Sequence, residues 1–329
     1  MPEPGRGAAR PRAIFFGTPA FAASVLRRLL EPDSPVEVVA AVTQPDKPVG
    51  RSQWAAPPPV KALALERGLQ VLQPATLRRP APVAALRRLA PALGIVAAYA
   101  KILPRDMLEV PPFGHLNVHA SLLPRWRGAW PIGAAIMAGD AVTGVSIMRL
   151  DAGMDTGPVL AARAEPIRPD DTTATLERRL APLGAGLLVE VIPGYLAGER
   201  VPQPQDDRQA TYCHPVRKAD GVVDWTQPAA VIERRVRALQ PWPVAYTFYA
   251  GKQLRILQAH VASQEALAAV VPLGPPGTVV RLGKGAAVAT GDGLLALDQV
   301  QLEGRQVVPV HAFVNGHHDF IGSRLGSGL

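Results

Sequence analysis

The chain of 329 residues contains a single cysteine, Cys213, so it cannot form an internal disulfide. Cysteine-poor chains are typical of reducing compartments, and we therefore expect a cytoplasmic protein. Residues 1–12 contain no apolar run of the kind that a secretory signal requires. The most apolar stretch, residues 89–100, is too short to cross a bilayer. We expect a protein that does not associate with membranes.

Two motifs of nucleotide-binding proteins are also missing from the sequence. The first predicted strand is followed by Gly17, Thr18 and Pro19 instead of the G-x-G-x-x-G that binds a dinucleotide. The chain has no G-x-x-x-x-G-K-[ST] loop either. These absences argue against a nicotinamide dinucleotide cofactor and against nucleotide hydrolysis.

The chain does contain enough apolar sequence for two folded domains. Hydrophobic residues make up 48% and charged residues 19%, which favours packed cores over disorder. The net charge of +8 favours an anionic partner, with nucleic acid the first candidate. Arginine greatly outnumbers lysine, and alanine and proline are abundant, a bias that GC-rich coding also produces. The charge by itself therefore leaves nucleic-acid binding open.

The first half alternates short apolar segments with helical patterns, which predicts a parallel, doubly wound sheet. Strands are expected at residues 13–16, 36–42, 69–72, 94–99 and 116–119, and helices at residues 19–30, 60–67, 82–90 and 132–138. Such sheets bind their ligands beyond the carboxyl ends of the strands. Functional side chains are therefore expected at those ends.

The second half has a different pattern. A helix is predicted over residues 172–197, followed by a polar, proline-containing linker at residues 198–210. After one further helix, short runs rich in valine, leucine and glycine follow at residues 254–261, 277–282 and 294–300. Closely spaced short strands predict a small antiparallel barrel.

Asn117 and His119 form the most informative pair in the sequence. They are two residues apart in a predicted strand, so their side chains emerge on the same face. They also stand at the carboxyl end of that strand, where a ligand is expected. An amide and an imidazole side by side suit a reaction that builds negative charge on a carbonyl oxygen, because both groups donate hydrogen bonds.

A glycine-rich loop with two aspartates, Asp151 and Asp155, follows a predicted strand at residues 144–150. A carboxylate from this loop could keep the imidazole protonated and orient an attacking amine or water. Asp155-Thr156-Gly157 also matches the loop of aspartic proteases, but those enzymes need two such loops in an all-β setting. Asn117 is a poor zinc partner and no cysteine joins the set, so no metal is expected.

Seven segments in order resemble the methionyl-tRNA formyltransferases, and together they cover nearly the whole chain. The segments are FGTP (16–19), QPDKPVGR (44–51), NVHASLLPRWRG (117–128), DAGMDTG (151–157), ATY (210–212), VDW (223–225) and QPWP (240–243). The order and spacing of these segments are specific to the family, whereas each segment alone would not suffice.

The resemblance implies a Rossmann-like α/β formyltransferase domain over residues 1–197, a linker over residues 198–210, and an OB-like antiparallel barrel that binds tRNA over residues 211–329. It also implies 10-formyltetrahydrofolate as the formyl donor, initiator methionyl-tRNA as the acceptor, and a monomeric enzyme. Carried over by position, the implied catalytic residues are Asn117, His119 and Asp155, and the implied folate-binding residues are Ser121, Leu122, Leu123 and Pro124.

Basic residues in both halves are the expected tRNA contacts. By resemblance, the loop with Lys47 and Arg51 enters the acceptor end of the tRNA. Residues 208–260 contain eight basic and three acidic residues, and could lie along the tRNA backbone. The candidates in this stretch are Arg217, Lys218, Arg234 and Arg235.

The sequence departs from the family pattern at three places. Ser52-Gln53-Trp54 follows Arg51 where the family has Gly-Lys-Lys, which removes two cations and adds an aromatic ring. Trp130 stands where a small alanine is usual, and Cys213-His214-Pro215 begins the second domain. The first two departures bear on the recognition of the acceptor.

Two other interpretations remain at this point. A formyltransferase for a small amine, such as an amino-sugar nucleotide, would share the Asn117, His119 and Asp155 set. A non-catalytic RNA-binding protein on the same fold would have no use for that set. The loop at residues 44–51 and the second half favour the tRNA substrate.

Overall fold

The computed structural model of the chain describes residues 9–48, 55–270 and 274–326. Its internal contacts divide the chain into two compact units. The first unit consists of Met1–Pro131, Val142–Pro166 and Glu177–Cys213, and the second of Ile132–Ala141, Ile167–Leu176 and His214–Leu329. Two segments of the predicted first domain thus group with the second unit, a division that differs from the predicted boundaries at residues 197 and 211. Those domain boundaries stay a prediction.

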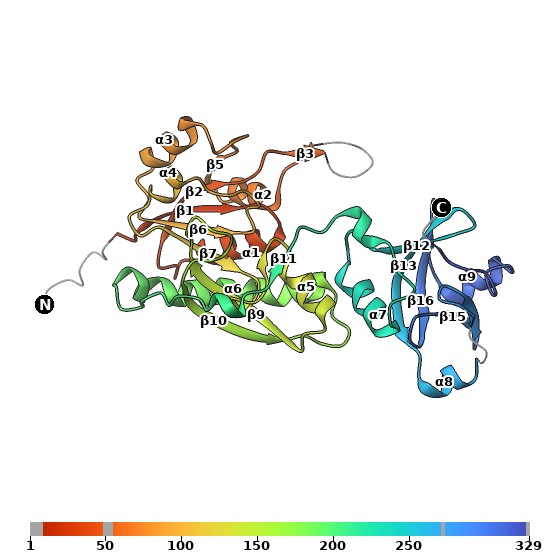
Figure 1. Cartoon of the computed structure of the whole chain (residues 1–329). Coiled ribbons are helices and arrows are strands. Elements are labelled where there is room, and N and C mark those ends of the chain that lie inside the picture. The colour runs from red at the N-terminus through yellow and green to blue at the C-terminus, as the bar shows by residue number, and fades with distance from the viewer. Residues whose placement is uncertain (1–8, 49–54, 271–273, 327–329) are drawn as a thin grey trace, which may run out of the picture. The chain divides into compact units, whose positions relative to one another are not determined.

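A seven-stranded sheet forms the centre of the first unit among the described residues, in the order β10-β9-β7-β6-β1-β2-β5 (Figure 1). The strands are β1 (Arg12–Gly17), β2 (Glu37–Val42), β5 (Gln70–Leu72), β6 (Leu93–Ala97), β7 (His115–His119), β9 (Val142–Arg149) and β10 (Val159–Pro166). The pairs from β5 to β7 are parallel, while β9 and β10 are antiparallel. The predicted parallel-rich α/β sheet is confirmed, and β10 is an edge strand that the apolar pattern did not indicate.

Helices flank this sheet: α1 (Ala20–Leu29), α2 (Pro59–Glu66), α3 (Pro80–Arg88), α4 (Arg105–Leu108) and α6 (Thr173–Leu196). The alternation of side chains along a strand explains the layers. Ile14 and Phe16 of β1 belong to one buried cluster with Leu86 of α3 and Met107 of α4. Strand β6 ends at Ala97, two residues earlier than expected, because Ala98 and the following backbone leave the β region, with φ of 44° at Ala98.

Helix α6 covers the other face of β7 and β9. A Cβ atom on its Gly184 would lie 2.7 Å from Cγ1 of Val118 and 2.9 Å from Cγ1 of Val145, so the helix approaches both strands closely. By length and composition α6 could cross a membrane, which the shorter stretch at residues 89–100 could not. Leu180, Leu188 and other apolar side chains of α6 are fully buried, so packing on the sheet accounts for this apolar face.

The second unit is built around an antiparallel sheet in the order β12-β13-β16-β15-β14, with β17 paired to β16. The strands are β12 (Ala245–Tyr249), β13 (Lys252–Val261), β14 (Val279–Leu282), β15 (Gly285–Ala289), β16 (Leu294–Leu302) and β17 (Val307–Pro309). Both edge strands meet the same C-terminal segment, through single bridges of Phe248 with Gly326 and of Thr278 with Arg324. The antiparallel second domain is confirmed, and these bridges bring its two edges toward closure.

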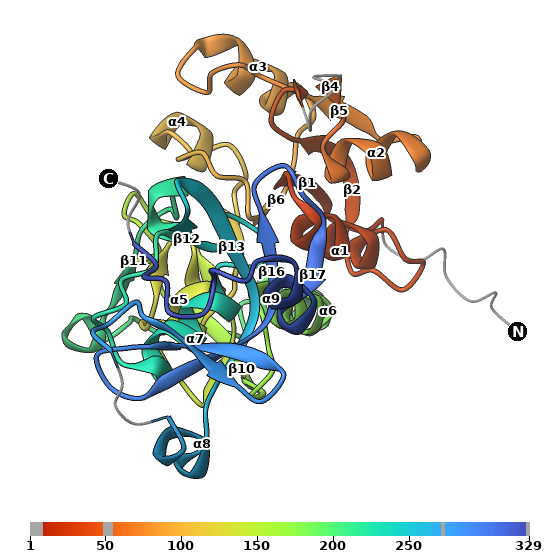
Figure 2. The same cartoon turned by 90° about the vertical axis from the view of Figure 1, so that its right-hand side faces the viewer.

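Helices complete the second unit: α5 (Pro131–Ala138), α7 (Ala229–Ala238), α8 (Gln264–Ala268) and α9 (Val310–Gly316). Figure 2 shows α9 beside β16 and β17. Residues 167–176 are joined to α7 by hydrogen bonds to main-chain oxygens. Arg237 Nη1 donates to Asp171 O at 2.9 Å, and Thr173 Oγ1 donates to Ala238 O at 2.6 Å. These bonds explain why residues 167–176 group with the second unit.

Candidate active site

Asn117 and His119 lie on β7, and both side chains are nearly buried, with 8% and 5% of their surface exposed. They project from the sheet face that Phe16 of β1 also occupies, because the ring of His115, on the same face of β7, lies 5.5 Å from that of Phe16. Val118, between them, faces α6 instead. The predicted alternation therefore holds, and both polar side chains stand at the carboxyl end of β7.

Asp155 reaches this pair from the loop after β9. Its Oδ2 lies 3.7 Å from Nδ1 of His119, and its Oδ1 lies 3.5 Å from Nδ2 of Asn117. The backbone N–H of Gly128 donates to the same Oδ2 at 2.8 Å. The structure therefore brings together the amide, the imidazole and the carboxylate that the sequence singled out.

The hydrogen bond of the other ring nitrogen defines the tautomer of His119. Nε2 lies 2.9 Å from the main-chain oxygen of Trp126. A carbonyl oxygen can only accept, so Nε2 carries a proton in this contact. Nδ1 is then an acceptor in the neutral ring and a donor in the imidazolium, and it is the nitrogen beside Asp155. Proton exchange at this site is therefore directed to Nδ1.

The two aspartates of the loop have different surroundings. Oδ1 of Asp151 accepts hydrogen bonds from the backbone N–H of Gly153 at 3.0 Å and from Oγ1 of Thr156 at 2.8 Å, so this side chain braces the loop. Asp155 has φ of +54°, a left-handed conformation that aspartate tolerates better than most residues. A Cβ at Gly157 would lie 1.9 Å from Arg149 O, so the loop can end there only on glycine. The geometry favours Asp155 over Asp151 as the functional carboxylate.

Gln205 and Arg127 support the loop of Asp155, and the sequence analysis assigned neither residue a role. The side-chain amide of Gln205 donates to the main-chain oxygens of Asp155 at 2.8 Å and Gly157 at 2.7 Å. Its Oε1 accepts from Nε and Nη2 of Arg127, a guanidinium with 1% exposure that also pairs with Asp207 at 2.7 Å. Gln205 lies in the predicted linker at residues 198–210, where one glutamine among many polar residues gives no signal of a specific role.

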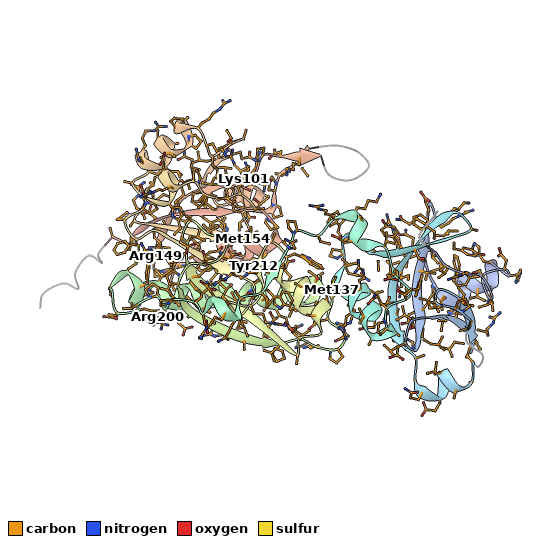
Figure 3. The ribbon with its side chains drawn as sticks, in the orientation of Figure 1. Lys101, Met137, Arg149, Met154, Arg200 and Tyr212 are labelled. Carbon is orange, nitrogen blue, oxygen red and sulfur yellow. The ribbon has the colours of Figure 1, made fainter. Side chains whose placement is uncertain are left out.

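The strand β11 (Tyr212–Cys213) pairs with β8 (Arg127–Gly128) and adds further contacts around Arg127. Arg127 N donates to Thr211 O at 2.9 Å, and Trp126 N donates to Thr211 Oγ1 at 2.9 Å. The hydroxyl of Tyr212, labelled in Figure 3, accepts from Arg127 Nη1 at 3.3 Å. Residues 205–213 therefore pack against the loops of the site instead of forming a free connection.

The predicted folate turn follows β7 directly. The polar groups of Ser121 are engaged inside the protein: its hydroxyl donates to Arg125 O at 2.5 Å and its carbonyl accepts from Ser146 Oγ at 2.8 Å. The side chains of Leu122, Leu123 and Pro124 are partly exposed and supply an apolar wall. The turn can thus offer a surface for a flat ring, while the Ser121 hydroxyl stabilises the turn itself.

The basic residues predicted to contact tRNA fall into two groups. Arg217 and Lys218 are exposed, as is Lys47, whose Nζ donates to Gln44 Oε1 at 3.0 Å. Arg234 and Arg235 are half-buried. Arg234 Nε donates to Met137 O at 3.2 Å, and Arg235 Nη2 donates to Asp220 O, so both contribute to packing within the second unit.

Part of the predicted tRNA loop lies outside the described residues, namely Arg51 and the departure Ser52-Gln53-Trp54. The described flanks of this loop pair as β3 (Lys47–Pro48) and β4 (Ala55–Ala56).

The other two departures meet at Cys213. The backbone N–H of Trp130 donates to Cys213 Sγ at 3.4 Å, and burial raises the pKa of this thiol. Trp130 is half-buried. Within the described part of the chain, no three His, Cys, Asp or Glu side chains gather as metal ligands.

Comparisons with known proteins agree with this architecture. A family model described as "Formyl transferase" matches residues 11–192, and one described as "Formyl transferase, C-terminal domain" matches residues 215–318. The methionyl-tRNA formyltransferase of Roseiflexus sp. (strain RS-1) is 47% identical, over 96% of this chain and 95% of its own length. The corresponding protein of Nitrosococcus oceani is 48% identical, over 94% of each chain.

A solved structure shares the fold at lower identity. The N-formyltransferase of Helicobacter canadensis, in complex with folinic acid and dTDP-3-aminofucose, is 16% identical and superposes with a TM-score of 0.65, over 89% of this chain and all of that one. At an identity this low, the likeness shows a shared fold alone. The two methionyl-tRNA formyltransferases above are 47% and 48% identical over nearly their full length, which is close enough to assign the family. On that evidence, the chain belongs to the methionyl-tRNA formyltransferase family.

Proposed function

We propose that the chain transfers the formyl group of 10-formyltetrahydrofolate to the amino group of initiator methionyl-tRNA. The observation that carries this proposal is the convergence of Asn117, His119 and Asp155 at one sheet edge, in a chain whose full-length relatives are methionyl-tRNA formyltransferases. A one-carbon transfer of this kind belongs to translation initiation, and we expect the enzyme to act as a monomer in the cytoplasm.

The proposed chemistry is a direct transfer. The neutral amine attacks the formyl carbon, which forms a C–N bond and leaves the formyl oxygen as an oxyanion. The Asn117 amide and the Nδ1–H of protonated His119 donate to this oxyanion. The bond from the formyl carbon to the folate nitrogen then breaks, and the folate nitrogen takes up a proton.

Asp155 has two parts in this scheme. Its Oδ2 lies 3.7 Å from Nδ1 of His119, so its negative charge attracts the imidazolium that donates to the oxyanion. It also stands where it can take the proton that the amine must lose, directly or through water. The side chain of Asp155 is 16% exposed, so a substrate can reach its carboxylate.

The donor would rest on the turn after β7. Leu122, Leu123 and Pro124 offer partly exposed apolar surface next to the catalytic strand, which suits a flat heteroaromatic ring. The H. canadensis enzyme of the same fold binds folinic acid, a related folate. This likeness supports a folate donor for the present chain.

An assay with labelled donor tests the acceptor. Purified protein would be offered initiator methionyl-tRNA, elongator methionyl-tRNA and a dTDP-amino-sugar, and the labelled product would be quantified for each. We expect rapid formylation of the initiator alone. Transfer to the amino sugar with none to either tRNA would contradict the proposal and identify a small-amine enzyme.

A further inference from the structure

We infer that Gln205 is a positioning residue for the reaction: it holds the turn of Asp155 so that the carboxylate faces His119 and Asn117. This inference rests on the proposed function, because it assigns Gln205 a role through the proposed catalytic carboxylate. Gln205 lies 50 residues from Asp155 in sequence and is half-buried beside it.

Every polar group of the Gln205 side chain is engaged in a way that fixes its orientation. Oε1 accepts two hydrogen bonds from Arg127, at 3.0 and 2.9 Å, and Nε2 donates two, to the main-chain oxygens of Asp155 and Gly157. A guanidinium cannot accept and a carbonyl cannot donate, so the amide can be placed in one orientation only. The side chain acts as a rigid connection between Arg127 and the loop.

The loop needs such a connection because its backbone is in an unfavourable conformation. A non-glycine residue in the left-handed region, such as Asp155 at φ +54°, persists only when its surroundings hold it there. Gln205 binds the carbonyl of this residue and the carbonyl two residues later, on both sides of Thr156. The direction of the Asp155 side chain follows from the main-chain geometry that these two bonds fix.

Small movements of Asp155 would matter for the reaction. Its oxygens are 3.5 Å from Asn117 Nδ2 and 3.7 Å from His119 Nδ1, so the first contact is at the outer limit of hydrogen bonding and the second lies beyond it. A displacement of about 1 Å in a catalytic group can cost about 10²-fold in rate. A loop released by Gln205 would therefore lose turnover while the substrate-binding surfaces stay in place.

Two substitutions separate this role from a purely structural one. Gln205→Glu has the same shape and keeps an acceptor for Arg127, but it cannot donate to the two carbonyls. Gln205→Met loses both sets of bonds. If Gln205 positions Asp155, both variants lower kcat by about 10- to 100-fold, with KM for donor and acceptor changed less than about threefold. Gln203→Glu is the matched control, since Gln203 is exposed in the same segment and should keep wild-type kinetics within about twofold.

A double-mutant cycle with Asp155→Asn then tests whether Gln205 acts through the carboxylate. In that background, Gln205→Glu should cost less than about twofold more, because effects through a shared group are not additive. Wild-type kcat in Gln205→Glu, a loss confined to KM, or full additivity in the cycle would each overturn the inference. A fall in Tm large enough to explain the lost activity in both variants would also overturn it, by assigning Gln205 to folding. Activity of the wild-type chain, measured alongside, tests the proposed function separately.

Discussion

The backbone N–H of Gly128 donates to Oδ2 of Asp155 across 2.8 Å, the shortest contact that this carboxylate makes in the site. Gly128 follows the buried Arg127, whose guanidinium binds Gln205, and Gln205 binds the main chain of Asp155. The carboxylate is thus held at its side chain by β8 and at its backbone by the segment after α6. Its orientation depends on three stretches that are far apart in sequence.

Replacing Asp155 by asparagine and by alanine should separate chemistry from loop stability. Both changes remove the negative charge beside His119, and each should lower kcat by about 10²–10³-fold, as loss of a well-placed electrostatic group does. Asparagine tolerates the left-handed φ and keeps an oxygen for Gly128, whereas alanine does neither. Alanine alone should therefore cost about 1–2 kcal/mol in the free energy of unfolding. Steady-state kinetics with urea denaturation measure both effects, and equal stability losses would contradict this account.

Gly128→Ala should damage both fold and activity. The residue has φ of +120°, and a Cβ there would lie 2.1 Å from the main-chain oxygen of Cys213, so β8 and β11 would have to separate. We expect a loss of at least about 2 kcal/mol in unfolding free energy together with reduced kcat. Gly186→Ala is the control, because a Cβ at that position in α6 meets no atom within 4 Å; it should gain about 0.5–1 kcal/mol. Similar denaturation midpoints for the two variants would refute the steric argument.

Acid should destabilise the protein through His115. Burial lowers the pKa of this ring to about 4, from its ordinary value of 6.5, so between these values the unfolded chain binds more protons than the folded one. Stability is then fully present above pH 6.5 and falls as the pH drops toward 4, by about 2 kcal/mol at pH 5. His115→Leu removes the titrating group. Its unfolding free energy should depend less on pH in this window than that of the wild type, and parallel pH curves would contradict the assignment.

Salt dependence should separate the two groups of basic residues in the second unit. If the exposed Arg217 and Lys218 contact phosphates, replacing both by alanine should reduce the slope of log affinity for tRNA against log salt by about 2. Arg234 and Arg235 donate to main-chain oxygens, so their alanine variants should lose thermal stability instead. Filter binding at several salt concentrations and melting curves test this division. An unchanged slope in the first variant would remove Arg217 and Lys218 from the interface.

Much of the fold could be predicted from local pattern. The apolar runs at β1 and β6 are buried on both faces, and such runs in alternation with helices indicate a parallel sheet. Strand β10 was not predicted, and only one of its eight residues is buried, as suits a strand at the edge of the sheet. The predicted strand at residues 94–99 is two residues too long at its end. The apolar sequence continues through Ala98 and Tyr99, but the backbone leaves the β conformation after Ala97.

The sequence by itself identified Asn117 and His119 as the candidate pair on β7. Period-two alternation places Asn117 and His119 on one face of any strand they share, and glycine spacing marks the loop of Asp155. The tertiary structure decided which aspartate turns inward, which nitrogen of His119 is available, and that Gln205 and Arg127 support the loop. The contacts of Asp155 with Gly128 and of Gln205 with Asp155 and Arg127 join residues 27 to 78 positions apart. A local pattern cannot encode them, because they arise only when distant segments pack together and satisfy their buried polar groups.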